Sequence, residues 1–91
     1  MVKSVYLIQS LEEGYYKIGV SKNPQKRVKQ LQTGNSSELK LIDSFPSEYA
    51  HTIEKSFHSR FFYLKKKENG LIFHYYKHFH LFKIVKEFTS L

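Results

Sequence analysis

One carboxylate and two imidazoles fall at spacings that would bring them together on a helix. Glu54 lies three residues after His51 and four residues before His58, so all three would share one helical face. Side chains in that arrangement could meet a substrate or an ion, and a glutamate oxygen is a ligand that Mg²⁺ prefers. A zinc site is a weaker interpretation, because nothing in the sequence supplies a fixed fourth ligand. An exposed pair between Glu54 and His58 is the purely structural alternative.

A second group of chemically suggestive residues is a cluster of cations between positions 22 and 29. Arg27 stays charged at every working pH, and its guanidinium can direct two donors at one phosphate. Lys22, Lys26 and Lys29 act instead as point charges that suit a nucleic-acid backbone. The structural alternative is that these cations only lie on a solvated helix face. The elements expected around Arg27 decide between phosphate binding and this alternative.

The first elements expected along the chain are an antiparallel hairpin and a short basic helix. Residues 2–9 and 15–21 are rich in Val, Ile and Tyr, and a loop that ends in glycine separates them. Asn23-Pro24 is typical of a helix start, so a helix is expected over 25–32. The hairpin and helix would carry Tyr6, Lys17 and Arg27.

The rest of the chain predicts one more strand of the same sheet and two helices. Residues 39–45 alternate apolar and polar and end at Pro46, which favours a third strand. Apolar residues at helical spacing predict an amphipathic helix over 48–62 and a C-terminal helix over 78–91. Between them we expect a charged connection at 63–70 and a short strand at 71–73. The order is β-β-α-β-α-(β)-α, a small α/β (α+β) fold with a three-stranded, mainly antiparallel sheet flanked by helices.

Composition limits the class of protein further. The 91 residues fit a single domain, and a formal net charge of +7 is typical of a protein that meets a polyanion such as DNA. The absence of cysteine excludes disulfides and thiolate metal sites, which favours an intracellular, cytoplasmic protein. No apolar run approaches the ~20 residues of a membrane span, and the first residues enter a strand pattern rather than a signal peptide.

An ordered set of motifs resembles the GIY-YIG nuclease superfamily. The most specific segment is KIGVSKNPQKRVKQL, which combines the second triplet with a helix cap and a lysine-arginine pair. The resemblance is closest to the short branch of phages and large DNA viruses, in which Lys replaces the first residue of the second triplet. It covers 2–73, leaves the C-terminal helix at 78–91 outside the match, and rests on these residues in order: Val5-Tyr6-Leu7, Lys17-Ile18-Gly19, Arg27, Glu54 and Asn69.

The resemblance implies a single-domain, metal-dependent endonuclease or nickase that hydrolyses phosphodiester bonds in DNA. One divalent ion, Mg²⁺ or Mn²⁺, would be held by Glu54, while Arg27 stabilises the phosphate. Tyr6 or a water beside it would prepare the nucleophile, with Lys17 and Asn69 completing the set. If register permits, Tyr6 and Lys17 share a face with a glycine that leaves open space for a backbone phosphate.

Two departures from the family pattern keep an alternative function open. Lys17 stands where many members have a second tyrosine, and either Tyr15 or Tyr16 beside it is a candidate for supporting catalysis. Leu31 lies where several members carry a histidine. The chain would then be a catalytically weakened nucleic-acid-binding, inhibitor or accessory protein.

Two further segments have open roles. The run His74-Tyr75-Tyr76-Lys77-His78-Phe79-His80 could stack on bases, hold a metal or form a homodimer, although inward packing of its aromatics is favoured. Lys65, Lys66 and Lys67 are candidates for contacts with phosphates, and a solvated loop is their structural alternative. Without an attached DNA-binding domain, specificity would come from this domain, from a second copy or from a partner protein.

Overall fold

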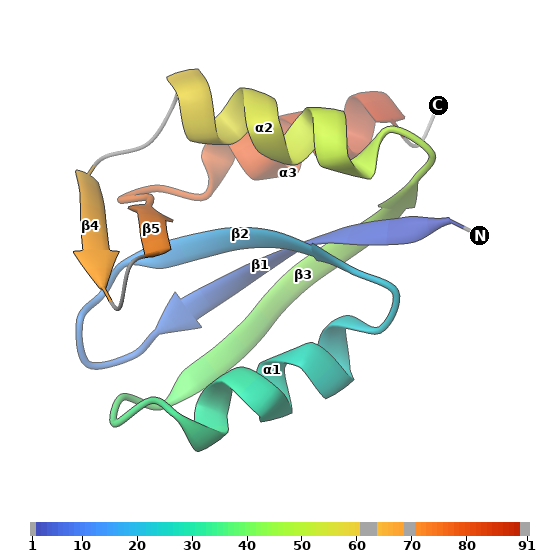
Figure 1. Cartoon of the computed structure of the whole chain (residues 1–91). Coiled ribbons are helices and arrows are strands. Elements are labelled where there is room, and N and C mark those ends of the chain that lie inside the picture. Colours follow the sequence, from blue (N-terminus) through green and yellow to red (C-terminus); the bar gives the residue numbers. More distant parts are fainter. Residues whose placement is uncertain (1, 61–63, 69–70, 90–91) are drawn as a thin grey trace.

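Three antiparallel strands form the central sheet of the computed structural model, which describes residues 2–60, 64–68 and 71–89 (Figure 1). The strands are β1 (Lys3–Ser10), β2 (Tyr16–Ser21) and β3 (Leu39–Ser47), in the spatial order β2-β1-β3. Because β1 lies in the middle, its side chains are buried on both faces of the sheet. The predicted hairpin and the three-stranded α+β architecture are confirmed.

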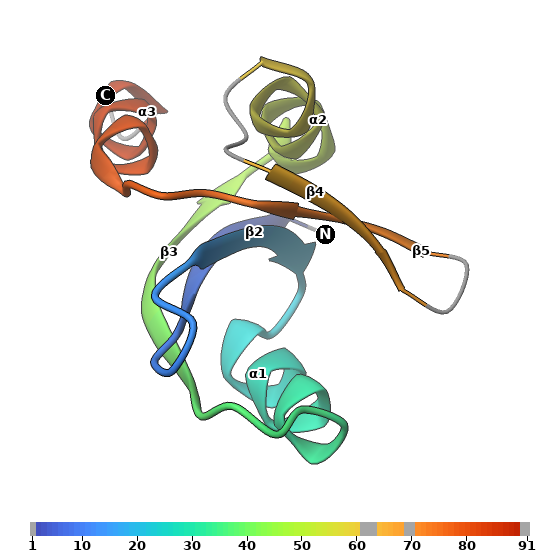
Figure 2. The same ribbon diagram turned by 90° about the vertical axis from the view of Figure 1, so that its left-hand side faces the viewer.

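Helices cover both faces of this sheet. One face carries α1 (Pro24–Thr33), and the other carries α2 (Ala50–Arg60) and α3 (His80–Thr89), as Figures 1 and 2 show. The α1 face holds a small cluster built on Tyr6, Ile8 and Leu39. The opposite face holds the larger apolar core, whose buried members are Val5, Leu7, Ile18, Phe45, Ala50, Phe57, Tyr76 and Phe82.

Local sequence explains where α1 begins and ends. The side chain of Asn23 accepts a hydrogen bond from the backbone N–H of Lys26 at 3.1 Å, and Pro24 occupies the first turn. Gly34 follows the last helical residue. The cap therefore fixes the rotation of the helix that carries Arg27.

Strand β3 differs from the prediction at both its interior and its end. The strand continues through Pro46 to Ser47, and it tolerates proline because β3 is an edge strand with one unpaired side. Its register with β1 shifts between Leu7 and Ile8, since Leu7 pairs with Asp43 while Ile8 pairs with Leu41. This bulge lets Leu41 face α1 and Phe45 face the larger core.

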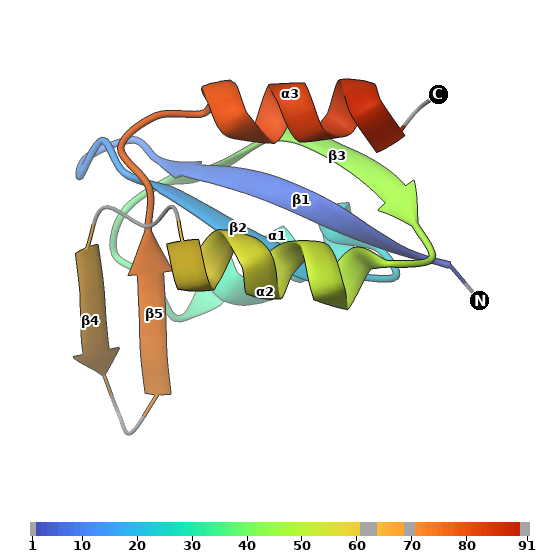
Figure 3. The same ribbon diagram turned by 90° about the horizontal axis from the view of Figure 1, so that it is seen from above.

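Within the expected charged connection at 63–70, the described residues 64–68 instead form one strand of a second hairpin. Strand β4 (Leu64–Glu68) contains the three lysines and pairs antiparallel with β5 (Leu71–Tyr75), as Figure 3 shows. The backbones of Tyr16 and Tyr76 exchange two hydrogen bonds, 2.7 and 2.8 Å long, and so join this hairpin to the outer edge of β2. The three lysines at 65–67 give this segment the composition of a loop, because lysine has little β propensity. Backbone pairing with β5 nevertheless makes it a strand.

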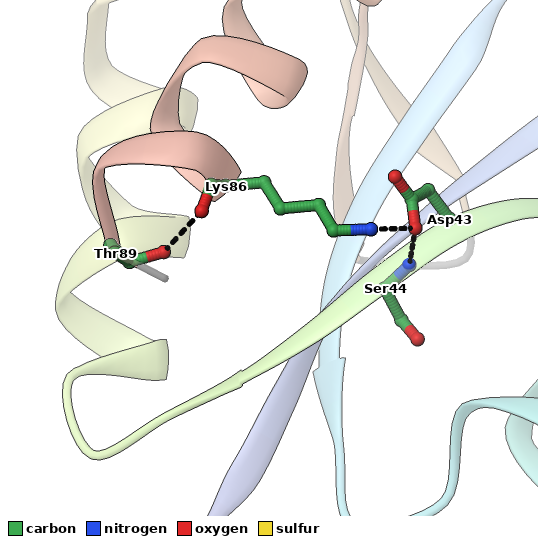
Figure 4. Close-up of polar contacts among 4 residues, drawn as sticks. All are labelled: Asp43, Ser44, Lys86 and Thr89. Atoms are coloured by element: carbon green, nitrogen blue, oxygen red, sulfur yellow. Dashed lines mark hydrogen bonds and ion pairs between the residues drawn. The ribbon is translucent and has the colours of Figure 1, made fainter. Parts of the chain in front are cut away.

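The two helices on the larger core begin two residues later than predicted. Helix α2 begins at Ala50 and is described to Arg60, so the expected continuation to 62 lies outside the described residues. Helix α3 begins at His80 and buries Phe82. An ion pair of 2.6 Å between Lys86 and Asp43 ties α3 to β3 (Figure 4), and its half-exposed partners make it worth about 0.2–1 kcal/mol. None of the helices in the described part of the chain has the length and hydrophobicity needed to cross a membrane.

Candidate functional site

The site begins with a tyrosine that lies over a glycine. Tyr6 on β1 pairs directly with Gly19 on β2, so both face α1. A Cβ atom added to Gly19 would lie 2.5 Å from Cζ of Tyr6, which shows that the phenol ring crosses the β2 backbone at this point. The expectation that Gly19 leaves open space for a phosphate is wrong, because Tyr6 fills that space. The glycine is needed for the close approach of the ring.

Helix α1 brings Arg27 to the hydroxyl of this tyrosine. The Arg27 guanidinium lies close enough to lower the pKa of the Tyr6 phenol, through a side-chain hydrogen-bonding interaction and through its positive charge. Arg27 is itself exposed, so the rest of its donors remain accessible from solvent. A pocket of about 210 Å³ opens beside this pair, lined by Tyr6, Ile8, Lys17, Ile18, Arg27, Leu31, Asn35 and Leu39.

Glu54 approaches Tyr6 from the opposite side of the sheet. Its half-buried side chain projects from α2, which packs against β1 and β2. The carboxylate charge is close enough to raise the pKa of both Tyr6 and Tyr76. Glu54 therefore lies within electrostatic reach of two phenols that belong to different faces of the sheet.

The electrostatic balance keeps Tyr6 protonated. Burial is the largest influence and raises the pKa of the phenol above its ordinary value of 10.0, while the Arg27 hydrogen bond and charge lower it in part. The Glu54 carboxylate adds a smaller upward effect. At neutral pH the Tyr6 hydroxyl is consequently a neutral group that can donate a hydrogen bond.

Lys17 and Tyr15 are organised by a third residue. The Lys17 ammonium lies 5.0 Å from the centre of the Tyr75 ring, and the Tyr15 ring meets Tyr75 edge-on at 5.9 Å. Tyr16 points to the other face of the sheet, where it packs against the larger core. Tyr15 and Lys17 therefore both contact Tyr75, whereas Tyr16 packs against the larger core.

The two histidines proposed to act with Glu54 have different partners. Nε2 of His51 accepts from the Lys3 ammonium at 3.2 Å, near the start of β1. Nε2 of His58 donates to the carbonyl of Ile18 at 3.1 Å, and its ring stacks on His74 with centroids 4.4 Å apart. No three His, Asp or Glu side chains in the described ranges gather closely enough to hold a metal, so the zinc interpretation has no support.

The remaining candidates divide into exposed cations and positions that cannot be described. Lys22, Lys26 and Lys29 are exposed on and beside α1. Lys65, Lys66 and Lys67 lie on β4, and Asn69 lies outside the described residues. In the run 74–80, Tyr75 and Tyr76 pack inward, whereas Lys77, His78, Phe79 and His80 are exposed.

Two residues near the site were missed in the sequence. Asn35 lines the pocket beside Arg27, where its side chain also accepts from the Ser37 backbone at 2.9 Å. Tyr76 is buried beside α2, and its pKa responds to Glu54. A turn residue and one tyrosine of an aromatic run carry no distinctive spacing, so only the folded chain shows their positions.

Comparison with known protein families identifies one family that matches this chain. The family model of the T5orf172 domain matches residues 3–89 and so includes every described helix and strand. The chain belongs to the T5orf172 domain family. This domain is associated with phages and with nuclease-like proteins, which indicates a nuclease-related function of phage type. No curated protein and no solved structure matches the chain significantly.

Proposed function

We propose that this T5orf172 domain is a metal-dependent DNA endonuclease or nickase of the GIY-YIG superfamily. The observation that supports this most is the position of Tyr6, which lines one pocket with Arg27 and whose pKa responds to the charges of both Arg27 and Glu54. A hydrogen-bond donor, a cation and a carboxylate are the groups that phosphodiester hydrolysis requires. Tyr6 and Arg27 line the pocket on the α1 face, and the charge of Glu54 acts on Tyr6 from α2. Their positions on β1, α1 and α2 follow the order of the GIY-YIG motifs.

In the proposed reaction, Arg27 binds the scissile phosphate and offsets the negative charge that develops on it. Tyr6 is too weakly acidic in the free protein to act as a phenolate, so its hydroxyl serves as a donor that orients the attacking water or a phosphate oxygen. Lys17, which lines the same pocket, adds a second positive charge near the phosphate. The chain itself therefore supplies anion binding and orientation.

The available donors suit a hard divalent cation such as Mg²⁺ or Mn²⁺. Glu54 would hold the ion, and Mg²⁺ commonly uses one or two carboxylates while water and substrate phosphate complete its coordination. When bound, such an ion supplies Lewis acidity and lowers the pKa of a coordinated water. The single carboxylate is compatible with this mode and incompatible with a closed structural zinc site.

Positive charge around α1 supports DNA as the substrate. Lys22, Lys26 and Lys29 are exposed near Arg27, and the chain has a formal net charge of +7. Contacts of this kind neutralise backbone phosphates without reading bases, so binding should weaken steeply with added salt. Recognition of a particular sequence would come from a second copy or from a partner protein.

A plasmid-nicking assay tests the proposed function. Purified protein is incubated with supercoiled plasmid and Mg²⁺ or Mn²⁺, beside Arg27→Ala and the control Lys83→Ala, which removes an exposed cation from α3. We expect nicking by the wild type that EDTA stops, a loss of about 10²-fold or more in Arg27→Ala, and wild-type activity in Lys83→Ala. Intact plasmid in every sample would contradict an endonuclease function.

One observation supports a second candidate function. Leu31 lines the pocket with an apolar side chain and packs against the Tyr6 cluster, so that position offers no base. A chain that retains the DNA-binding surface without turnover would act as a nucleic-acid-binding or accessory protein. Salt-sensitive binding to plasmid without any nicking, under either metal, would identify this alternative.

A further inference from the structure

Tyr76 is fixed in position by contacts at its backbone and its ring. Its backbone N–H and carbonyl both bond to Tyr16 of β2. The centre of its ring lies 6.2 Å from that of Phe57, in an edge-on contact, and 6.1 Å from that of His58, so the ring packs against α2. These contacts leave the tyrosine little freedom to move its hydroxyl elsewhere.

The Tyr76 hydroxyl has no hydrogen-bond partner. The residue is only 3% exposed, and its hydroxyl oxygen is the one buried side-chain polar atom found without a partner in the described part of the chain. Buried hydroxyls are nearly always paired, since an unpaired one lowers stability. A phenylalanine would fill the same apolar space, so packing alone does not explain why the residue at position 76 carries a hydroxyl.

Glu54 is the best-placed hydrogen-bond acceptor for the Tyr76 hydroxyl. It lies three and four residues before Phe57 and His58, the two α2 residues that the Tyr76 ring contacts. A tyrosine hydroxyl carries its proton at neutral pH and can donate to a carboxylate, and the Glu54 charge acts on the Tyr76 phenol. Nε2 of His58 is already committed to the Ile18 carbonyl.

We propose that Tyr76 is a positioning residue of the cleavage site, whose hydroxyl donates a hydrogen bond to the Glu54 carboxylate when the site is loaded. The phenol is held in place by its backbone and ring contacts, so the half-buried Glu54 side chain is the partner that would move to form this bond. A carboxylate that ligates a metal is oriented by such a partner, and loss of the partner weakens metal binding. The inference rests on the proposed function, since it gives Tyr76 a role in holding the same ion.

The variant Tyr76→Phe tests this role with the full chain and Mn²⁺ as the probe. Mn²⁺ binding is measured without DNA by electron paramagnetic resonance, and nicking is measured across Mn²⁺ concentrations. We expect Tyr76→Phe to need about 10-fold more Mn²⁺ for both, with an unchanged KM for DNA and a thermal midpoint equal to or above that of wild type. Tyr49→Phe, which loses a hydroxyl from an exposed ring, is the matched control and should behave as wild type.

A double variant separates the hydrogen bond from a general packing effect. If Tyr76 acts through Glu54, adding Tyr76→Phe to Glu54→Gln should not weaken Mn²⁺ binding any further. Wild-type Mn²⁺ dependence in Tyr76→Phe, or a lower thermal midpoint together with lost activity, would overturn the inference while leaving the proposed function intact. A wild-type protein that neither binds Mn²⁺ nor nicks DNA would overturn both.

Discussion

Tyr6 and Gly19 act as one unit at the scale of single residues. The tyrosine ring occupies the volume that any side chain at position 19 would need. The close approach also directs the Tyr6 hydroxyl toward Arg27. Position 19 is therefore a glycine because the ring needs the space, and not because the backbone turns there. The motif in the sequence predicted that both residues matter, but it gave the wrong reason for the glycine, because strand register decides what lies above it.

The first prediction concerns Gly19→Ala. The added methyl collides with the Tyr6 ring, so we expect a loss of about 1–3 kcal/mol in the free energy of unfolding and nicking as low as in Tyr6→Phe. Gly34→Ala is the control, since nothing lies within 4 Å of its added Cβ and its φ of −99° suits alanine. Urea unfolding and nicking rates measured on both variants check this; equal behaviour of the two would show that Tyr6 does not occupy the space above Gly19.

At the scale of elements, α1 matters because it carries Arg27 to the pocket that Tyr6 lines. Its start was predictable from Asn23-Pro24, since a cap and a proline act locally and need no tertiary contact. The bulge in β3 and the β4–β5 hairpin were not predictable in this way. Both depend on which backbone groups find partners across the sheet, and the lysines of β4 have the composition of a loop.

The second prediction uses the cap of α1. Asn23→Ala removes the acceptor for the Lys26 backbone N–H and should cost about 1 kcal/mol. For a chain of this size that corresponds to a fall of roughly 4–8 °C in Tm. Asn23→Ser keeps a capping oxygen and should melt within a degree or two of wild type. Thermal unfolding followed by circular dichroism distinguishes the variants, and identical Tm values for the two would exclude a stabilising cap.

At the scale of the whole molecule, two buried tyrosines link stability to alkaline pH. Burial raises the pKa of Tyr6 and of Tyr76 above the value of 10.0 that both have in the unfolded chain. Below pH 10 both states hold these protons, so the stabilisation is complete. Above pH 10 the unfolded chain releases them first, and the free energy of unfolding falls by up to about 1.4 kcal/mol per pH unit for each tyrosine.

The third prediction follows from this linkage. Tyr76→Phe should lose stability less steeply than wild type between pH 10 and 11, whereas Tyr49→Phe should keep the wild-type slope because that ring is exposed. Urea unfolding at several pH values gives the slopes. If all three proteins lose stability in parallel, the pKa of Tyr76 is not raised by folding.

At this scale the two kinds of charge come from different faces of the central sheet. Lys17 and Arg27 line the pocket on the α1 face, while the charge of Glu54 acts on the same tyrosine from α2. DNA affinity and cleavage should therefore depend on overlapping but different residues. Affinity is expected to follow the cations, whereas cleavage also requires the Glu54 carboxylate.

The nicking rate of Glu54→Gln, measured with DNA affinity on the same sample, tests the central claim most directly. If Glu54 holds the metal, the variant should lose cleavage while its DNA affinity stays equal or rises slightly, because a negative charge facing the backbone is gone. Glu87→Gln on α3 is the matched control and should cleave as wild type. If Glu54 were only a boundary residue beside His58, the exposed pair would contribute about 0.3–0.5 kcal/mol and the rate would change less than about threefold. A near wild-type rate in Glu54→Gln would remove this carboxylate from the site and contradict the account.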